Sequence, residues 1–349
     1  MNVLGIFRGF PGLGRVVSGI SLLETLRDDY NCKIKIISYL QGNKYLTLRG
    51  YTDMQDVIPM DYCSIGLLPT NEMGVHIHNT IKTFKPDVVI LDGEPLIIQS
   101  LRISYPMLKI VALLNPADVD NPDNDTEAMD YFNSMYSLAD LAIVHGLRKV
   151  YLTKYHYKKI ISIGTILRRE LLGVFNKPTP NIYCILGGGT INVSHQFEAS
   201  TVHIAELCQG VARFFPDYTI HIVCSSQNIY EAINANHSYQ NVILYNQVLC
   251  AENYYKNACL VITRSGRNTL SELAYMGIPT ISFITGDEYR SVEQQQNLSS
   301  LNIEYVRSVS IDIGVEFLAE TIQSLLSNKK QRVHFDFGNH LAIQNILNI

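Results

Sequence analysis

The stretch LVITRSGRNTLSELAYMGIP (residues 260–279) joins an apolar run to a helical pattern through a glycine-containing turn. The run LVIT predicts a buried strand, because it is continuously apolar rather than alternating. Gly266 predicts a turn, and a helix then begins near Asn268 and Thr269. One interpretation is a well-capped helix in which Thr269 and Glu272 form a capping pair. The other is a site where free backbone amides at the helix start hold an anion.

The same order of strand and helix recurs along the whole chain. Continuous apolar runs predict buried strands at residues 2–7, 33–38, 87–92, 109–114, 141–146 and 159–164. After a proline-containing stretch at 173–181 the pattern restarts with IYCILGGG, YTIHIVCS, NVILYN, ACLVITRSG and PTISFI. Helical patterns between such runs are typical of a parallel sheet. We therefore expect an α/β protein of two Rossmann-like doubly wound domains that face each other across a cleft.

The composition is that of an ordinary globular protein. The 349 residues are 47% hydrophobic and 17% charged, with a net charge of −4, so there is no global basic field and nucleic acid is not an expected partner. The seven cysteines are scattered and never spaced as CxxC, which argues against a disulfide framework and a zinc site. No apolar run of about 18 residues and no leader pattern occurs, so we expect a cytoplasmic protein.

Three glycine-containing turns follow predicted strands. The turn at 8–19 contains Gly14 and is a weak signal, since a lone GxG often only reverses the chain. LGGGT at 186–190 is a stronger signal, because three glycines before a hydroxyl residue favour a backbone nest for an anion. In the third turn, Ser265 and Thr269 add hydroxyl donors to the amides at the helix start.

Motifs after residue 260 occur in a characteristic order: Ser265-Gly266, Thr269, Glu272, Gly277-Ile278-Pro279, Glu293-Gln294 and Asn297. This order resembles the donor-site signature of GT-B glycosyltransferases related to the peptidoglycan N-acetylglucosaminyltransferase, the family 28-like group. Further resemblances lie at 12–26, 85–95, 163–170 and 338–347. They imply an acceptor-binding domain over 1–168, a linker over 169–180, a nucleotide-sugar-binding domain over 181–335, and a terminal helix over 336–349 that packs back on the first domain.

The resemblance implies a role for each donor-site residue. Glu272 would accept both ribose hydroxyls of a nucleotide. Glu293 and Gln294 are candidates for sugar hydroxyls, with a solvated helix start as the alternative. Arg264 would contact a phosphate or lie at the surface. The diphosphate would be held without a metal by the turn before the second helix and by the GGGT loop, which together comprise Ser265, Gly266, Asn268, Thr269, Gly188, Gly189 and Thr190.

The first loop departs from the family pattern. Family members commonly carry a catalytic His where this chain has Arg15, and an arginine stays protonated and cannot act as a base. Asp92 and Glu94, which follow the third predicted strand, are the best substitutes for the base. The alternative for Asp92 is a strand-end cap. Arg15 itself, near Gly14 at a helix start, could clamp the donor phosphates or an anionic acceptor.

These motifs predict a metal-independent inverting transferase that moves a sugar from a nucleotide diphosphate, expected to be UDP, to an unidentified polar or lipid-linked acceptor, with no cofactor. Two alternatives keep the donor site: a nucleotide-sugar hydrolase of the same fold, and a non-catalytic sugar-nucleotide-binding partner subunit. The basic run at 148–159 carries three tyrosines and would allow peripheral contact with the inner face of a membrane. The other interpretation of that run is the solvated face of a helix.

Overall fold

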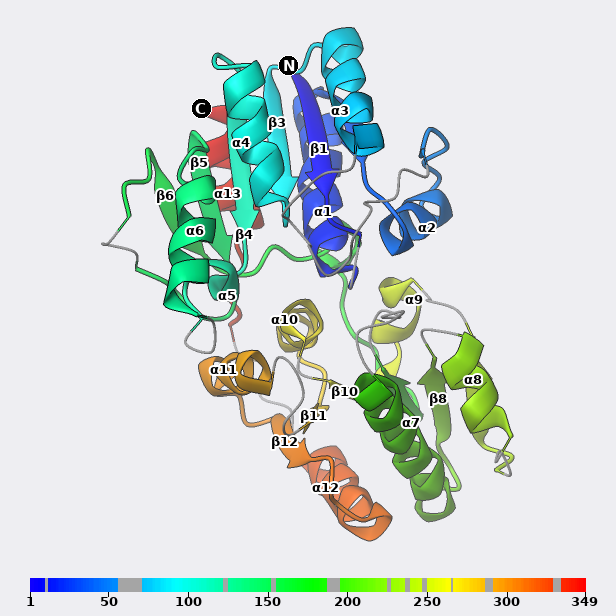
Figure 1. Cartoon of the computed structure of the whole chain (residues 1–349). Coiled ribbons are helices and arrows are strands. Elements are labelled where there is room, and N and C mark those ends of the chain that lie inside the picture. Colours follow the sequence, from blue (N-terminus) through cyan, green and yellow to red (C-terminus); the bar gives the residue numbers. More distant parts are fainter. Residues whose placement is uncertain are drawn as a thin grey trace. The chain divides into compact units, whose positions relative to one another are not determined.

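The computed structural model divides into two compact units, Met1–Arg169 with Phe337–Ile349 and Glu170–Asp336 (Figure 1). It describes residues 1–9, 12–55, 71–121, 125–151, 155–186, 195–224, 227–235, 239–246, 250–264, 266–285, 291–328 and 334–349. Each unit is built on a six-stranded parallel sheet with helices on both faces. The prediction of two Rossmann-like doubly wound domains is therefore confirmed.

The first unit has the strand order β2-β1-β3-β4-β5-β6. Its strands are β1 (Asn2–Phe7), β2 (Lys33–Ile37), β3 (Val88–Asp92), β4 (Lys109–Leu114), β5 (Leu141–His145) and β6 (Ile160–Ile163). Its helices are α1 (Gly14–Tyr30), α2 (Gln41–Leu48), α3 (Asn71–Phe84), α4 (Pro95–Ser104), α5 (Pro116–Val119), α6 (Thr126–Tyr136) and α13 (Asn339–Leu347). The chain direction across this sheet reverses between β1 and β3, and ligands of open α/β sheets bind where such a reversal occurs.

The second unit has the order β12-β11-β10-β7-β8-β9, with its reversal between β7 and β10. Its strands are β7 (Asn181–Ile185), β8 (Thr219–Val223), β9 (Val242–Tyr245), β10 (Ala258–Arg264), β11 (Thr280–Ile284) and β12 (Val306–Ser310). Its helices are α7 (His195–Gly210), α8 (Gln227–Asn234), α9 (Ala251–Tyr255), α10 (Arg267–Met276), α11 (Ser291–Leu301) and α12 (Val315–Ser327), with short 3₁₀ turns at Arg169–Leu171 and Val211–Phe214. Both glycine-containing turns of this half thus follow the two strands that flank the reversal.

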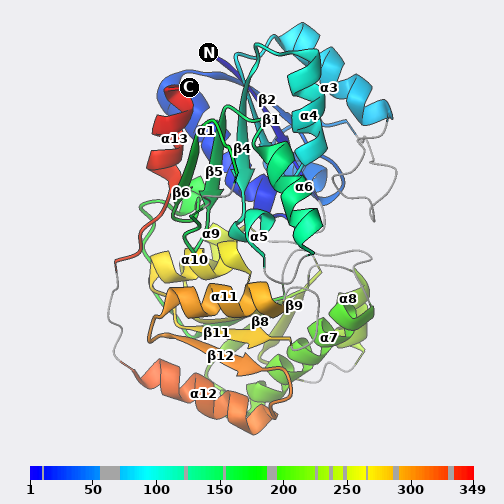
Figure 2. The ribbon, with the colours of Figure 1, turned by 60° about the vertical axis from the view of Figure 1, so that its left-hand side comes forward.

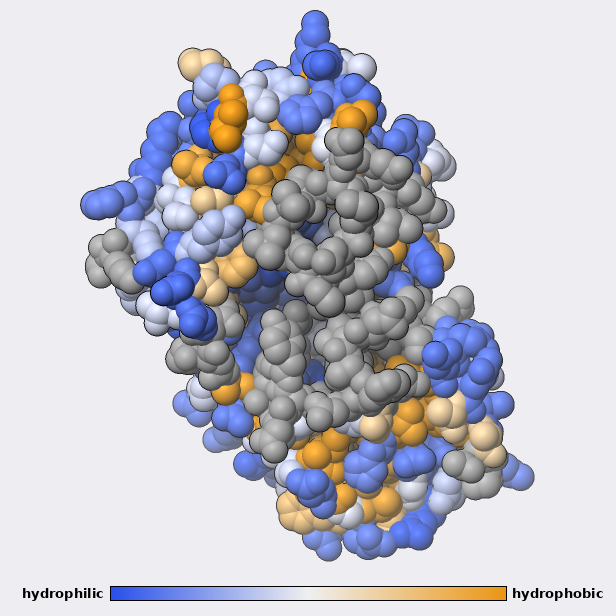
Figure 3. All heavy atoms as spheres, in the orientation of Figure 1, coloured by the Kyte–Doolittle hydropathy of each residue, from blue (hydrophilic) through white to orange (hydrophobic). Residues whose placement is uncertain are grey.

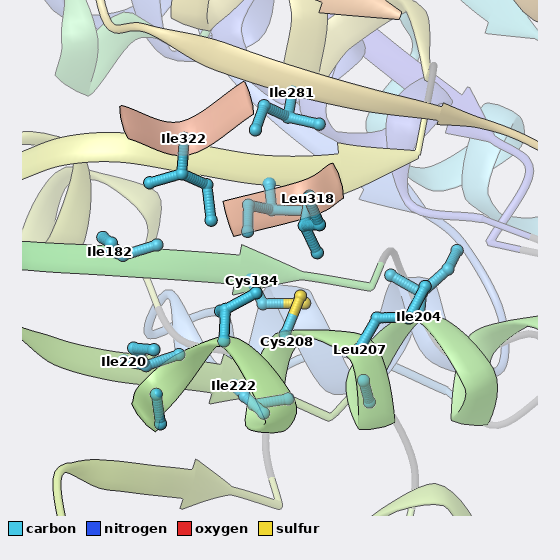
Figure 4. Packing of buried hydrophobic residues seen from close by; sticks show 14 of the residues in the cluster. Ile182, Cys184, Ile204, Leu207, Cys208, Ile220, Ile222, Ile281, Leu318 and Ile322 are labelled. Carbon is cyan, nitrogen blue, oxygen red and sulfur yellow. The ribbon is translucent and has the colours of Figure 1, made fainter. Parts of the chain in front are cut away.

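Alternate side chains of β7 and β8 build the core of the second unit against α7 and α12. Figure 4 shows Ile182, Cys184, Ile220 and Ile222 facing side chains from those two helices. All four are fully buried, and full burial of one such aliphatic side chain contributes roughly 1.5–3 kcal/mol. Burial also raises the pKa of the Cys184 thiol well above its usual value, so this cysteine is a packing residue rather than a reactive one.

The last helix, α13, belongs to the first unit and packs beside α1, as Figure 2 shows. Asn339, its first residue, accepts a hydrogen bond from the Leu167 amide at 2.8 Å and donates to the Leu167 carbonyl at 2.9 Å. A Cβ at Gly338 would lie 2.2 Å from the Gly164 carbonyl oxygen, so only glycine permits this close approach. Residues 164–167 and 338–339 are therefore tied together within the first unit.

The basic run at 148–159 is not helical where the structure describes it, so its interpretation as a solvated helix face is wrong. Arg148 pairs with Asp120, and the Lys158 ammonium lies 2.6 Å from an Asp140 carboxylate oxygen. Part of its positive charge is thus neutralised within the unit. On the face drawn in Figure 3, apolar side chains occur in several groups among hydrophilic ones. Among the described helices, none combines the length and apolar character needed to cross a bilayer.

Candidate functional site

The N-cap residue of α10 is a glycine, which has no side chain that could cap the helix. Gly266 is the N-cap residue, and the first helical hydrogen bond runs from the Leu270 amide to the Gly266 carbonyl at 3.0 Å. The proposed capping pair of Thr269 and Glu272 is therefore wrong, because the helix starts at Arg267 and Thr269 already lies inside it. A helix N-terminus that follows a glycine is a common place for an anionic ligand to bind.

Gly266 is not required by the fold around it. Its backbone, with φ −71° and ψ 133°, lies in a region open to any residue. It is exposed, and a Cβ built there would meet nothing within 4 Å among the described atoms. Space beside a helix N-terminus is what a bound phosphate would need.

Three buried charged residues lie between positions 264 and 272, at the end of β10 and in α10. Arg264 and Arg267 are each 7% exposed, and Glu272 is 0% exposed. Two guanidinium groups thus accompany one carboxylate, and the helix N-terminus adds a partial positive charge of its own. An anion placed here would gain from both contributions. Glu272 lies on the buried side of α10, whereas a ribose contact would favour an exposed side chain.

The remaining donor-site candidates of the second unit lie on α11, which packs beside α10. Gln294 accepts hydrogen bonds from the amide and the hydroxyl of Thr285, at 3.3 and 3.1 Å, and so fastens the end of β11. Glu293 is half-buried and Asn297 is buried. The side chain of Gln294 is therefore fixed by hydrogen bonds and is not part of a fully solvated helix start.

The other candidates of the second unit lie before α11 in the chain. Asn268, on α10, is half-buried and accepts a hydrogen bond from Arg267 Nε at 3.0 Å. The candidates Gly188, Gly189, Thr190 and Ser265 lie outside the described residues.

The first unit brings Arg15 and Asp92 together, with a third residue that the sequence did not single out. Arg15, in the first turn of α1 after Gly14, pairs with Asp92 at the end of β3 and donates to both oxygens of Asp118 at 3.0 and 2.7 Å. Although burial opposes it, Asp118 and Asp92 raise the pKa of Arg15 well above its usual value. Burial raises the pKa of Asp118, but Arg15 outweighs this and lowers it.

Asp118 is fixed by its own short helix, α5. One of its oxygens accepts a hydrogen bond from the Asn115 amide at 2.8 Å, as in a capping box. Gly93, with φ +87°, lets Arg15 lie close to the chain, because a Cβ there would be 2.7 Å from Arg15 Cδ. Arg15 is therefore held on carboxylates, which disfavours its predicted role as a clamp for phosphates.

Glu94 lies one residue beyond Gly93 in a second small cluster. The Tyr39 hydroxyl donates to Glu94 Oε1, and Arg8 Nε lies 3.6 Å from the same oxygen. Burial, and then the Glu94 carboxylate, raise the pKa of Tyr39 well above its usual value, so Tyr39 stays a donor. The Glu94 side chain is 10% exposed, whereas the Asp92 side chain is 0% exposed. Glu94 is thus the better placed of the two to meet a ligand.

No group of three His, Cys, Asp or Glu side chains suited to a metal ion occurs among the described residues. Sequence reasoning missed Tyr39, Arg8 and Asp118. The pattern Asn-Pro-x-Asp at 115–118 was the one available signal, since it predicts a capped helix start directly after a strand.

Comparison with known proteins finds a family model that matches most of the second unit. The model of the glycosyltransferase family 28 C-terminal domain matches residues 192–336. A relative from Rickettsia bellii (strain RML369-C), the UDP-N-acetylglucosamine--N-acetylmuramyl-(pentapeptide) pyrophosphoryl-undecaprenol N-acetylglucosamine transferase, is 37% identical over 106 residues. That match covers 30% of this chain and 28% of the relative, so the chain matches less than a third of the relative's length.

Solved structures similar to the whole chain show the fold. MurG from Acinetobacter baumannii superimposes with a TM-score of 0.60 at 14% sequence identity. The match covers 100% of this chain and 99% of the MurG chain. The UDP-GlcNAc 2-epimerase from Methanocaldococcus jannaschii gives a TM-score of 0.62 at 15% identity, with 100% and 99% covered. These likenesses agree with two Rossmann-like domains of the GT-B type.

Proposed function

The second unit of this chain is a glycosyltransferase family 28 C-terminal domain within a GT-B fold, and from that premise we propose that the chain is an inverting, metal-independent glycosyltransferase. Its proposed donor is UDP-N-acetylglucosamine, the nucleotide sugar named for the Rickettsia relative. The observation that carries the proposal is the start of α10, where a helix with a glycine N-cap begins within a stretch that holds two buried arginines and one buried carboxylate. Such a site suits a diphosphate.

In this proposal three groups of residues in the second unit bind the diphosphate, the ribose and the sugar of the donor. The diphosphate binds the turn at Gly266 and the first amides of α10, which stabilise the charge that develops on the departing UDP. Glu272 accepts the ribose hydroxyls after a small rearrangement that exposes its carboxylate. Glu293, Gln294 and Asn297 on α11 bind the sugar hydroxyls, and the Gln294–Thr285 contact supports this by fixing the side chain.

We assign the base to Glu94, because its side chain is partly exposed and that of Asp92 is not. The acceptor oxygen forms a bond to the anomeric carbon of the sugar while the bond from that carbon to the diphosphate breaks. UDP leaves with the electron pair, and the acceptor proton passes to Glu94. Tyr39 and Arg8 both approach Oε1, so Oε2 is the proposed proton acceptor. Arg15 and Asp118 would hold Asp92 in place.

The acceptor proposed is lipid-linked, by likeness to the Rickettsia relative, whose name specifies a pyrophosphoryl-undecaprenol substrate. A lipid-linked acceptor requires contact with a membrane surface. The basic run supports this only weakly, since Arg148 and Lys158 already pair with carboxylates.

Isothermal titration with UDP, UDP-N-acetylglucosamine and GDP in the presence of a chelator tests the donor site. We expect UDP and UDP-N-acetylglucosamine to bind without metal and GDP to bind more weakly. The same mixtures are then assayed for released UDP and free sugar. Bound donor that is released only when a lipid-linked acceptor is added supports the transferase. Rapid release without acceptor would indicate a hydrolase, and binding without turnover under any condition would indicate a partner subunit. No binding of either UDP ligand would overturn the proposal.

A further inference from the structure

Arg264 points into the second unit rather than out of it. Its Nη1 donates to the Ser200 hydroxyl at 3.0 Å and to the Thr201 hydroxyl at 2.8 Å, both on α7. The residue is 7% exposed, so the alternative of a surface residue is wrong. These contacts connect the last residue of β10 with the helix that follows β7. The two strands are neighbours at the reversal of the sheet.

The backbone of the same residue is held as firmly as its side chain. The Gly266 amide donates to the Arg264 carbonyl at 2.7 Å. The Thr263 hydroxyl lies within hydrogen-bonding distance of the Arg264 carbonyl and of the Ile185 carbonyl on β7, at 3.2 and 3.1 Å. Hydrogen bonds thus hold both the side chain and the carbonyl group of Arg264, which lies immediately before the start of α10.

A buried guanidinium is costly to hold unless it is hydrogen-bonded, and its planar, multi-donor shape is well suited to fixing several partners at once. The Ser200 and Thr201 hydroxyls supply part of that hydrogen bonding. A turn that is already fixed in the free protein loses less conformational entropy when a ligand binds to it.

We propose that Arg264 is a positioning residue, which ties the β10–α10 turn to α7 through Ser200 and Thr201 and so presents the start of α10 to the diphosphate. This inference rests on the proposed function, since it assumes a diphosphate at that helix start. It replaces the direct phosphate contact expected for Arg264 by an action through the backbone of the turn.

The test compares UDP with uridine, because a tie that acts on the diphosphate should not affect a nucleoside without phosphates. In the double variant Ser200→Ala/Thr201→Val, which keeps the arginine, we expect the Kd for UDP to rise about tenfold and that for uridine to stay the same. Arg264→Lys should show a similar split, because a lysine lacks the planar fork. Thr321→Val, at a half-buried threonine of α12, is the matched control.

Unchanged UDP affinity in the double variant would overturn the inference while leaving the donor site intact. An equal loss of UDP and uridine affinity would also overturn it, since it would indicate a general structural role. Should Arg264→Lys fail to fold, the double variant still decides. If the wild-type protein binds no UDP, the proposed function fails, and this inference fails with it.

Discussion

The reversal points of the two sheets hold their arginines in different ways. In the first unit, Arg15 lies between Asp92 and Asp118, so its charge is cancelled by neighbours. In the second unit, Arg264 donates to two neutral hydroxyls of α7. The arginine at one reversal point is thus paired with carboxylates, and the arginine at the other is hydrogen-bonded to hydroxyl groups.

This difference indicates how the work of a transferase would be divided. A site that binds a diphosphate needs backbone amides at a helix N-terminus in a fixed position. A site that accepts a proton needs a carboxylate whose position is fixed by a hydrogen bond to one of its oxygens. Glu94 fits this requirement, because the Tyr39 hydroxyl donates to its Oε1. The reversal point of the first unit therefore suits proton transfer, and the reversal point of the second unit suits the binding and departure of UDP.

The strongest test of this division is Glu94→Gln. We expect kcat to fall by about 10²–10⁴, because the general base is lost, while the Kd for UDP stays unchanged. The measurement is transfer to a lipid-linked acceptor, with UDP titrations on the same preparation. Asp87→Asn serves as the control, since Asp87 accepts from the Asn2 amide at the opposite end of the sheet. Turnover within about threefold of wild type would remove Glu94 as the base.

The second test is Glu272→Gln, for which we expect UDP binding to weaken by about 1.5–3 kcal/mol through loss of a charged acceptor. Titrations should compare UDP with its 2′-deoxy analogue. If Glu272 binds the ribose, the variant no longer distinguishes the two. Glu206→Gln, at an exposed position of α7, is the control. A variant that still prefers UDP over the analogue as strongly as wild type would contradict the ribose role.

The third test extends the comparison to stability in acid. Burial raises the pKa of Asp140, but hydrogen bonds from Lys158 and Arg102 outweigh it and lower the pKa to about 2. Because the folded-state pKa lies below the unfolded one, the stabilisation is complete above about pH 4 and is lost between about pH 4 and pH 2. Since Lys158 is largely exposed, we expect this to contribute about 1–2 kcal/mol.

Urea unfolding at several pH values between about 2 and 6 measures this contribution. Wild type should lose the stabilisation on acidification, and Asp140→Asn should be less stable than wild type at pH 6 by about that amount but equal to it near pH 2. Glu316→Gln, which removes an exposed ion pair with Arg213 in the second unit, is the control. A constant difference between wild type and Asp140→Asn across the range would refute the assignment.

The smallest expected effect comes from Gly266→Ala. Its backbone angles and the open space around it predict no change in Tm. If the space belongs to a phosphate, UDP should bind about 1 kcal/mol more weakly, and uridine equally well. Thermal melts and titrations of both ligands check this. Unchanged UDP affinity would place the diphosphate elsewhere.

The fold could be predicted from the sequence because its signal is local. Parallel strands buried on both faces appear as continuous apolar runs, and six such runs match β1 to β6 within one or two residues. The start of α10 was predicted one or two residues late, since Gly266 rather than a polar residue is the N-cap. Helix ends are the least determined part of such a pattern.

The charged partners could not be predicted, because they join residues far apart in the chain. Arg15 and Asp118 are 103 positions apart, and Tyr39 and Glu94 are 55 apart. No periodicity encodes such pairs. The inward direction of Arg264 and the full burial of Glu272 depend likewise on how α7 and α10 pack.

The return of α13 to the first unit affects the order in which a nascent chain can fold. Ala342, Ile343 and Ile346 belong to the core around α1, yet they are synthesised after the entire second unit. At typical translation rates, residues 170–336 take roughly 10–30 s to appear. Throughout that interval the surface of α1 that α13 covers is open to chaperones. The unit whose synthesis begins first is therefore the last to be completed.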